Sequence, residues 1–238
     1  MDNKIEKFKE LVKSSNNIVF FGGAGVSTES GIPDFRSKDG LYNQKYDYPP
    51  EEILSHTFFI NKTEEFYKFY REKLNSLNYE PNITHIKLAE LEKQGKLKSV
   101  ITQNIDGLHQ KAGSKRVLEL HGSVLRNYCM KCKKFFDAEY VFKNCGIPTC
   151  ECGGIIKPDV VLYEEGLDDK ILYNAIHDIQ NADLMIVAGT SLTVQPASGL
   201  INYFRGKNLV LINKDKTFYD TKADLVINES LGKVFKEI

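Results

Sequence analysis

A histidine, an asparagine and an aspartate follow two apolar runs in the middle of the chain. Asn104 and Asp106 come after the run at 98–102, and His121 comes directly after the run at 116–120. If these runs are parallel strands, their carboxyl ends meet at one sheet edge, where ligands bind. Among the side chains at this edge, only His121 has a pKa suited to proton transfer near neutrality, and Asn104 and Asp106 can hold a polar ligand. Taken alone, His121 fits a structural histidine at a strand end better, and its place on the same edge as Gly23, Arg36 and Asp106 reverses that preference.

A glycine turn after the first apolar run adds a nucleotide site to the same edge. Without β-carbons, Gly23 and Gly25 would let a diphosphate approach the backbone amides, and a helix beginning near Val26 would direct its positive end to the anion. Thr28 stands where the usual dinucleotide fingerprint has its third glycine, which argues against an ordinary dehydrogenase. For this segment alone, the alternative is a turn whose glycines serve packing only.

Two later strand ends also carry small polar residues. The segment Gly189-Thr190-Ser191 follows the run at 184–188, and Asn213 follows the run at 208–212. Their hydroxyl and amide groups can hold a ribose or an adenine at this edge. Capping of loops and helices by serine and asparagine explains the same residues without a ligand.

Four cysteines have the spacing of metal ligands. Cys129-x-x-Cys132 and Cys150-x-Cys152 are separated by seventeen residues, so two turns can each supply two thiolates to one zinc ion. Four thiolates fill a tetrahedral shell and leave no position for water, which predicts a structural ion. The alternative is a set of reduced buried cysteines. Cys145 is left as an ordinary thiol.

The elements that must position these residues follow an α/β pattern. Helical patterns at 83–91 and 171–179 lie between short apolar runs, and such runs suit strands that are buried on both faces. The alternation predicts a doubly wound, parallel, Rossmann-like sheet. Its expected strands cover 17–21, 98–102, 116–120, 184–188, 208–212 and 224–227.

Two inserts interrupt this alternation and predict a small second domain. Aromatic and apolar residues between 66 and 77 have helical spacing, which indicates a helical module over 37–80 with a packed face. The cysteines indicate a zinc-binding module over 127–155. The remaining segments, 1–36, 81–126 and 156–238, would form the discontinuous nucleotide-binding domain.

Composition limits the possible partners and location. The 238 residues include 32 basic and 32 acidic side chains, so bulk charge gives no reason to expect direct nucleic-acid binding. The segment 1–12 has the spacing of an amphipathic helix rather than a secretory signal, and no apolar run reaches eighteen residues. We therefore expect a cytoplasmic protein without a membrane partner.

Seven sequence blocks occur in the order found in one family. Over essentially its full length the chain resembles the sirtuins, NAD-dependent protein-lysine deacylases, in their compact bacterial form. The blocks are Gly23-Ala24-Gly25-Val26-Ser27, Gly31-Ile32-Pro33-Asp34-Phe35-Arg36, Thr102-Gln103-Asn104-Ile105-Asp106, His121-Gly122, the four cysteines, Pro158-Asp159-Val160-Val161 and Gly189-Thr190-Ser191-Leu192.

The resemblance implies a cofactor position and a reaction. The acyl-lysine oxygen would attack the nicotinamide ribose of NAD, and His121 would then deprotonate a ribose hydroxyl, giving deacylated lysine, nicotinamide and an O-acyl-ADP-ribose. Phe35, Ile105 and Asp106 would form the nicotinamide pocket, and Arg36 and Gln103 would position the cofactor. The full set expected to contact NAD is Gly23, Ala24, Gly25, Thr28, Asp34, Phe35, Arg36, Gln103, Asn104, Ile105, Asp106, His121, Gly189, Thr190, Ser191 and Asn213.

The resemblance also implies where an acyl-lysine protein or peptide binds. The peptide would add as a strand between the segments 160–165 and 193–197, with contacts to Val160, Val161, Leu162, Tyr163 and Val194.

Two departures from the family pattern concern substrate choice. Tyr163-Glu164-Glu165 replaces the Phe-Gly-Glu of many relatives, which suggests a bias toward basic residues beside the target lysine. Relatives that prefer acidic acyl groups carry Tyr-x-x-Arg, whereas here Arg71 comes one residue late after Tyr67, a rotation of about 100° along a helix. We therefore expect acetyl or other uncharged acyl groups.

Two other functions fit the same cofactor site. One is mono-ADP-ribosyl transfer to protein, because it also begins with displacement of nicotinamide. The other is a non-catalytic, NAD-sensing zinc module, although a binding module has no need of a base such as His121.

Overall fold

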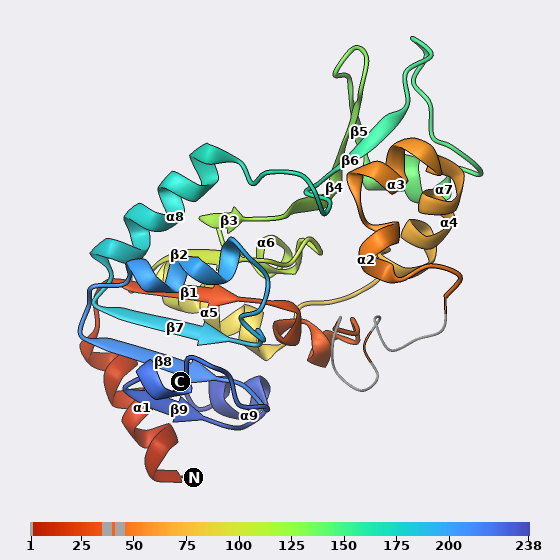
Figure 1. Cartoon of the computed structure of the whole chain (residues 1–238). Helices are drawn as coiled ribbons and strands as arrows, with labels where there is room; N and C mark the ends of the chain where they lie inside the picture. Colours follow the sequence, from red (N-terminus) through yellow and green to blue (C-terminus); the bar gives the residue numbers. More distant parts are fainter. Residues whose placement is uncertain (1, 35–39, 41–45) are drawn as a thin grey trace.

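The computed structural model describes residues 2–34, 40 and 46–238, and a six-stranded sheet lies at its centre (Figure 1). All neighbouring strands pair in parallel, in the order β3-β2-β1-β7-β8-β9. The strand order reverses direction at β1, as in doubly wound Rossmann-like sheets, so the expected fold class is confirmed. The strands are β1 Ile18–Gly22, β2 Leu97–Thr102, β3 Val117–Glu119, β7 Leu184–Ala188, β8 Asn208–Ile212 and β9 Leu225–Ile227.

Alternate residues of β1 fill two separate cores. Ile18 and Phe20 belong to the core on one face of the sheet, and Val19 and Phe21 belong to the core on the other. All four side chains are fully buried. Burial on both faces explains why the strand reads as a continuous apolar run rather than an alternating one.

Helices cover both faces of this sheet (Figure 1). Phe8, Leu88 and Phe235 pack three helices onto one face, and Ile179 and Leu200 pack two onto the other. The first group is α1 Asp2–Ser14, α5 Ile83–Lys93 and α9 Leu231–Phe235, and the second is α8 Asp169–Asn181 and η4 Ala197–Tyr203. Short turns of helix lie at α6 Leu108–Lys111 and η5 Asp220–Lys222.

A smaller antiparallel sheet and four helices lie to one side of the main sheet (Figure 1). The sheet has the order β5-β4-β6. In the sequence, β4 begins directly after His121, which lies two residues beyond the end of β3. Its strands are β4 Gly122–Cys129, β5 Phe135–Asp137 and β6 Ile156–Val160, and the helices are α2 Pro50–Ile53, α3 His56–Asn61, α4 Thr63–Lys73 and α7 Ala138–Lys143.

The two inserts share one hydrophobic core. Phe66 and Tyr70 of α4 are fully buried in the same cluster as Val141 and Ile156. The Tyr70 ring also stacks on Phe142, with a centroid distance of 5.3 Å and an interplanar angle of 4°. This shared core supports our proposal that the two inserts form one small domain, with the boundaries given above.

The structure contradicts one local prediction, the helix that was expected to begin near Val26. The chain instead makes two single 3₁₀ turns, η1 Ala24–Val26 and η2 Thr28–Ser30, and the second ends at Gly31 with φ +94°. Two glycines in three residues disfavour an α-helix, and Val26 is held by burial in the core. The turn therefore presents no α-helical N-terminus to a phosphate.

None of the helices among the described residues combines the length and the apolar composition needed to cross a bilayer.

Candidate active site and metal centre

One cavity lies over the carboxyl ends of β1, β2, β7 and β8, with a volume of about 1280 Å³. This volume exceeds the roughly 300–1,000 Å³ that is usual for a site holding one small ligand. Phe35 and Arg36 lie outside the described residues. All other residues predicted to contact cofactor or peptide line this cavity: Gly23, Ala24, Gly25, Thr28, Asp34, Gln103, Asn104, Ile105, Asp106, His121, Val160, Val161, Leu162, Tyr163, Gly189, Thr190, Ser191, Val194 and Asn213.

His121 is oriented by a backbone carbonyl. Its Nδ1 lies 3.0 Å from the Gln103 oxygen, and because a carbonyl oxygen can only accept, Nδ1 carries the proton. The other nitrogen, Nε2, then keeps a free lone pair. Burial lowers the pKa of His121 below its ordinary value of 6.5, against an opposing effect of the hydrogen bond to Gln103. A neutral imidazole with an unprotonated Nε2 at the cavity wall has the form of a general base.

A buried serine joins Asn104 to Asp106. The Ser27 hydroxyl donates to Asp106 Oδ2 at 2.6 Å and accepts from Asn104 Nδ2 at 3.0 Å. Asp106 Oδ1 accepts from the Leu108 amide at 2.9 Å. Burial raises the pKa of Asp106, whereas the hydrogen bonds from Ser27 and Leu108 lower it. This network fixes both polar side chains at the floor of the cavity.

A second polar network crosses from β2 to β8. Gln103 Nε2 donates to Thr190 Oγ1 at 3.0 Å, and the Thr190 amide donates to Asn213 Oδ1 at 3.0 Å. Asn213 Nδ2 is buried and has no hydrogen-bond partner within the described residues. A buried amide donor without a partner is costly, so this atom suits a ligand with an acceptor, such as a ribose hydroxyl or an adenine nitrogen. The cavity therefore fits a dinucleotide at this end.

The glycines of the turn serve close packing of two chain segments. The amides of Gly23 and Gly25 donate to Ala188 and Gly189 oxygens, at 3.3 and 2.8 Å. A β-carbon on Gly25 would lie 2.8 Å from the Gly189 Cα, which no side chain tolerates. The neighbouring strand end therefore uses both of these amides, and a diphosphate at this turn would need other donors.

The opposite wall of the cavity is tied to the helical insert. Tyr163 donates its amide to the Leu54 oxygen at 2.9 Å and accepts from the His56 amide at 3.0 Å, so its backbone makes a parallel bridge beside Ser55. This pairing occupies one edge of the segment 160–165. Thr193 and Val194 line the same cavity.

The two residues that would select acidic acyl groups do not line this cavity. Tyr67 is fully buried and donates its hydroxyl to the Ile156 oxygen. Arg71 donates to the backbone oxygens of Val141, at 3.0 Å, and of Gly146. The guanidinium is thus directed to the zinc-binding insert, in agreement with the rotation expected from its sequence position.

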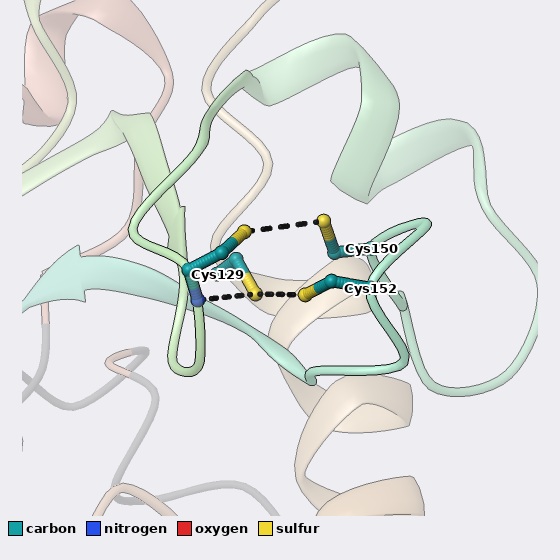
Figure 2. Close-up of side chains that lie close together, drawn as sticks. Cys129, Cys150 and Cys152 are labelled. Carbon is teal, nitrogen blue, oxygen red and sulfur yellow. Dashed lines mark hydrogen bonds between the residues drawn. The ribbon is translucent and has the colours of Figure 1, made fainter.

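The four predicted metal ligands converge at one point (Figure 2). The Sγ atoms of Cys129, Cys132, Cys150 and Cys152 all lie within 4.8 Å of one another. The distance is 3.4 Å from Cys129 to Cys152 and 3.6 Å from Cys132 to Cys150. Thiolates bound to zinc at about 2.3 Å are about 3.8 Å apart in a tetrahedron, so the cluster fits one ion. Cys145 is exposed and outside the cluster.

Sequence reasoning missed two residues that support the site. Ser27 lies in the first sequence block but is not among the residues predicted to contact a ligand, and its signal is a small hydroxyl directly after a glycine turn. Ser76 donates its hydroxyl to the Asp106 oxygen at 3.0 Å from the end of the helical insert. No local signal identifies Ser76, because its partner lies thirty residues away in the sequence.

Comparisons with known proteins agree with this geometry. The Sir2 family model matches residues 23–196, which include the glycine turn, His121 and the four cysteines. An NAD-dependent protein deacetylase of Clostridium perfringens (strain 13 / Type A) is 62% identical over 242 residues, which cover 100% of this chain and 99% of that protein. A second protein of that name, from Cutibacterium acnes, is 49% identical and covers 98% of this chain and 96% of its own.

Solved structures give the same result. A structure described as Sir2 with p53 peptide and NAD+ has a TM-score of 0.87 and 40% identity, and the match covers 98% of this chain and 96% of the other. A structure described as Sir2 bound to acetylated peptide has a TM-score of 0.87 and 38% identity, with the same coverage.

Proposed function

The chain belongs to the Sir2 family, and from this premise we infer that it is an NAD-dependent protein-lysine deacetylase. One observation carries this conclusion: His121 lines the same cavity as the polar networks around Asp106 and Thr190. The segment 160–163, which we propose as the peptide-binding wall, lines that cavity too. When bound, NAD supplies the ribose carbon that receives the acyl oxygen as nicotinamide departs. Acyl-lysine proteins or peptides are the second substrate.

His121 acts as the general base at its Nε2 atom. The Gln103 carbonyl holds the ring with Nδ1 protonated, so Nε2 is the atom that takes a proton from a ribose hydroxyl. The four cysteines would hold a zinc ion in a structural role, since four thiolates would leave no open position for a water.

Asn104 and Asp106 orient the reacting end of the cofactor. Ser27 holds the two side chains together, and the capped Leu108 amide fixes the Asp106 carboxylate. Their contribution is positional, since a well-oriented site lowers the barrier without any covalent step by the protein. Gly23, Gly189 and Thr190 shape the floor for the pyrophosphate, and Asn213 holds the adenosine end.

The peptide binds in extended form between the segments 160–163 and 193–194. Tyr163 already pairs with the helical insert on one side, so the substrate adds on the other side through backbone hydrogen bonds. Uncharged acyl groups are favoured, because Arg71 is engaged with Val141 and Gly146 and does not reach the cavity. Glu164 keeps a negative charge on the cavity rim, which favours basic residues beside the target lysine.

A peptide assay tests the assignment. The protein is incubated with an acetyl-lysine peptide with and without NAD, and peptide mass and free nicotinamide are followed together. We expect a loss of one acetyl group per nicotinamide released, and at least about a hundredfold lower rate for His121→Ala. Deacetylation without NAD, or full activity of His121→Ala, would contradict the assignment.

Two further arms separate the remaining alternatives. A peptide that gains the mass of ADP-ribose would indicate mono-ADP-ribosyl transfer, and NAD binding without turnover would indicate a sensing module. A succinyl-lysine peptide of the same sequence tests the preference for uncharged acyl groups, and we expect it to react much more slowly than the acetyl peptide.

A further inference from the structure

Glu164 occupies a backbone conformation that normally selects glycine. Its φ angle is +76°, and only Lys133 and Leu192 share a positive φ among the described residues other than glycine. Left-handed backbone is disfavoured for side chains with a β-carbon. Because this residue lies in the wall that receives the peptide, some contact must compensate for the strained conformation.

The compensating contact is made with the beginning of α3. Glu164 Oε2 accepts from the Thr57 amide at 2.9 Å and from the Thr57 hydroxyl at 2.7 Å. The preceding residue, Tyr163, accepts from the His56 amide, and Ser55 accepts from the Phe58 amide through its own hydroxyl. The cavity wall thus supplies partners for two of the first three amides of α3, which would otherwise lack intrahelical acceptors.

Glu165 stabilises the same turn through hydrogen bonds to Leu162 and Lys157. Glu165 Oε2 accepts from the Leu162 amide at 2.9 Å and from Lys157 Nζ at 3.0 Å, and Oε1 lies 2.8 Å from His56 Nδ1. The turn at 162–165 is therefore held at both of its acidic residues. Of these two carboxylates, Glu164 accepts from a backbone amide of α3, whereas Glu165 contacts the His56 side chain.

We propose that Glu164 is a positioning residue that clasps the peptide-binding wall to the N-terminus of α3 and so holds the cleft ready for the acyl-lysine peptide. This inference rests on the proposed function. A glycine at position 164 would relieve the backbone but remove this side-chain contact, leaving the wall held by the Tyr163 backbone bonds and by Glu165 alone. A wall that is ordered before binding loses less conformational entropy when the peptide binds, so the clasp should act on peptide affinity rather than on the chemical step.

Three variants test the clasp. Glu164→Gly removes the carboxylate, and Glu164→Gln keeps an oxygen that can accept from Thr57. Lys133→Gly relieves a comparable backbone (φ +61°) at a residue that does not line the cavity. We expect Glu164→Gly to raise the peptide KM roughly fivefold, about the effect of one net hydrogen bond, with kcat and the NAD KM unchanged. Glu164→Gln should stay within about twofold of wild type for a neutral peptide, and Lys133→Gly should match wild type in zinc content and kinetics.

Direct titration of the same acetyl-lysine peptide, monitored by calorimetry, provides a readout that does not need turnover. The Kd should rise in Glu164→Gly by the same factor as KM. Thr57→Val should weaken binding in the wild-type background but not in Glu164→Gly, because the two residues form one interaction. An unchanged Kd in Glu164→Gly, or an equal loss in Glu164→Gln, would overturn the clasp. Wild-type protein that binds the peptide but never deacetylates it would overturn the proposed function instead.

Discussion

At the scale of the residue, the environment of His121 predicts how the enzyme responds to pH. Burial lowers the pKa of this imidazole below 6.5, so the neutral form that can accept a proton persists below that pH. We expect the acidic limb of kcat/KM to fall below pH 6.5, and activity to be lost as pH decreases through the lowered value. Steady-state rates measured from pH 5 to 8 with saturating NAD check the position of the limb.

NMR titration tests whether His121 is the group responsible for the acidic limb of kcat/KM. The chain contains five histidines, so the imidazole signal that disappears in His121→Ala can be identified and its titration followed. A limb at or above pH 6.5, or a His121 signal that titrates there, would contradict the burial argument.

The residue scale also shows where sequence reasoning succeeds and where it fails. His121, Asn104 and Asp106 were predicted to lie at one sheet edge because each follows an apolar strand, and the topology of parallel sheets brings strand ends together; all three line the cavity. Ser27 was missed because its function depends on two partners more than seventy residues away. The hydrogen bonds of the Gly23 and Gly25 amides leave no sequence signal for the same reason, since Ala188 and Gly189 approach them only in the folded chain.

At the scale of the element, α5 and α6 meet through two buried histidines. The rings of His85 and His109 are 4.7 Å apart, and both side chains are almost completely inaccessible to solvent. Burial lowers the pKa of His85 to about 4, and burial followed by the neighbouring His85 lowers that of His109 well below 6.5. Both rings are therefore neutral in the folded protein at neutral pH.

This pair should make the fold sensitive to acid. Between pH 6.5 and about 4 the unfolded chain binds protons at His85 that the folded chain does not, so stability falls as pH decreases. His85→Gln removes the titrating group and keeps a side chain suited to the capping box with Asn82. We expect the free energy of unfolding to fall less in this variant over that range, by on the order of 3 kcal/mol.

Urea unfolding at pH 7, 6, 5 and 4 measures this difference. The slope against pH is the relevant quantity, because the introduced glutamine can also change stability at every pH. Parallel slopes for the wild type and the variant would show that His85 does not carry the acid sensitivity.

The secondary-structure elements also differ in how accurately the sequence predicts them. Each of the six apolar runs is a strand within one or two residues of its expected bounds, because burial on both faces leaves a strong compositional signal. The first 3₁₀ turn after β1 has no such signal, since Gly25 and Val26 pack closely against Gly189 only in the folded chain. The bridge between Ser55 and Tyr163 joins segments more than a hundred residues apart and has no local pattern at all.

At the scale of the whole molecule, the cysteine cluster and the wall that we propose to bind the peptide are parts of one continuous structure. β6 begins four residues after Cys152 and ends at Val160, which lines the cavity. Cys129 and Cys150 are buried in the same core as Phe66 and Tyr70 of the helical insert. Loss of the ion should therefore loosen the peptide-binding wall, although no cysteine lies in the cavity.

Replacing one ligand tests this coupling. In Cys150→Ser the remaining three thiolates hold zinc less well, and the small domain loses part of a binding free energy on the order of 10 kcal/mol. We expect zinc content to fall from one ion per chain, proteolysis to begin within 127–155, and the peptide KM to rise before NAD binding is lost. Cys145→Ser is the matched control, because Cys145 is exposed and outside the cluster, and it should keep zinc, stability and activity. A Cys150→Ser protein that is free of zinc yet stable and fully active would show that the cleft stands without the ion.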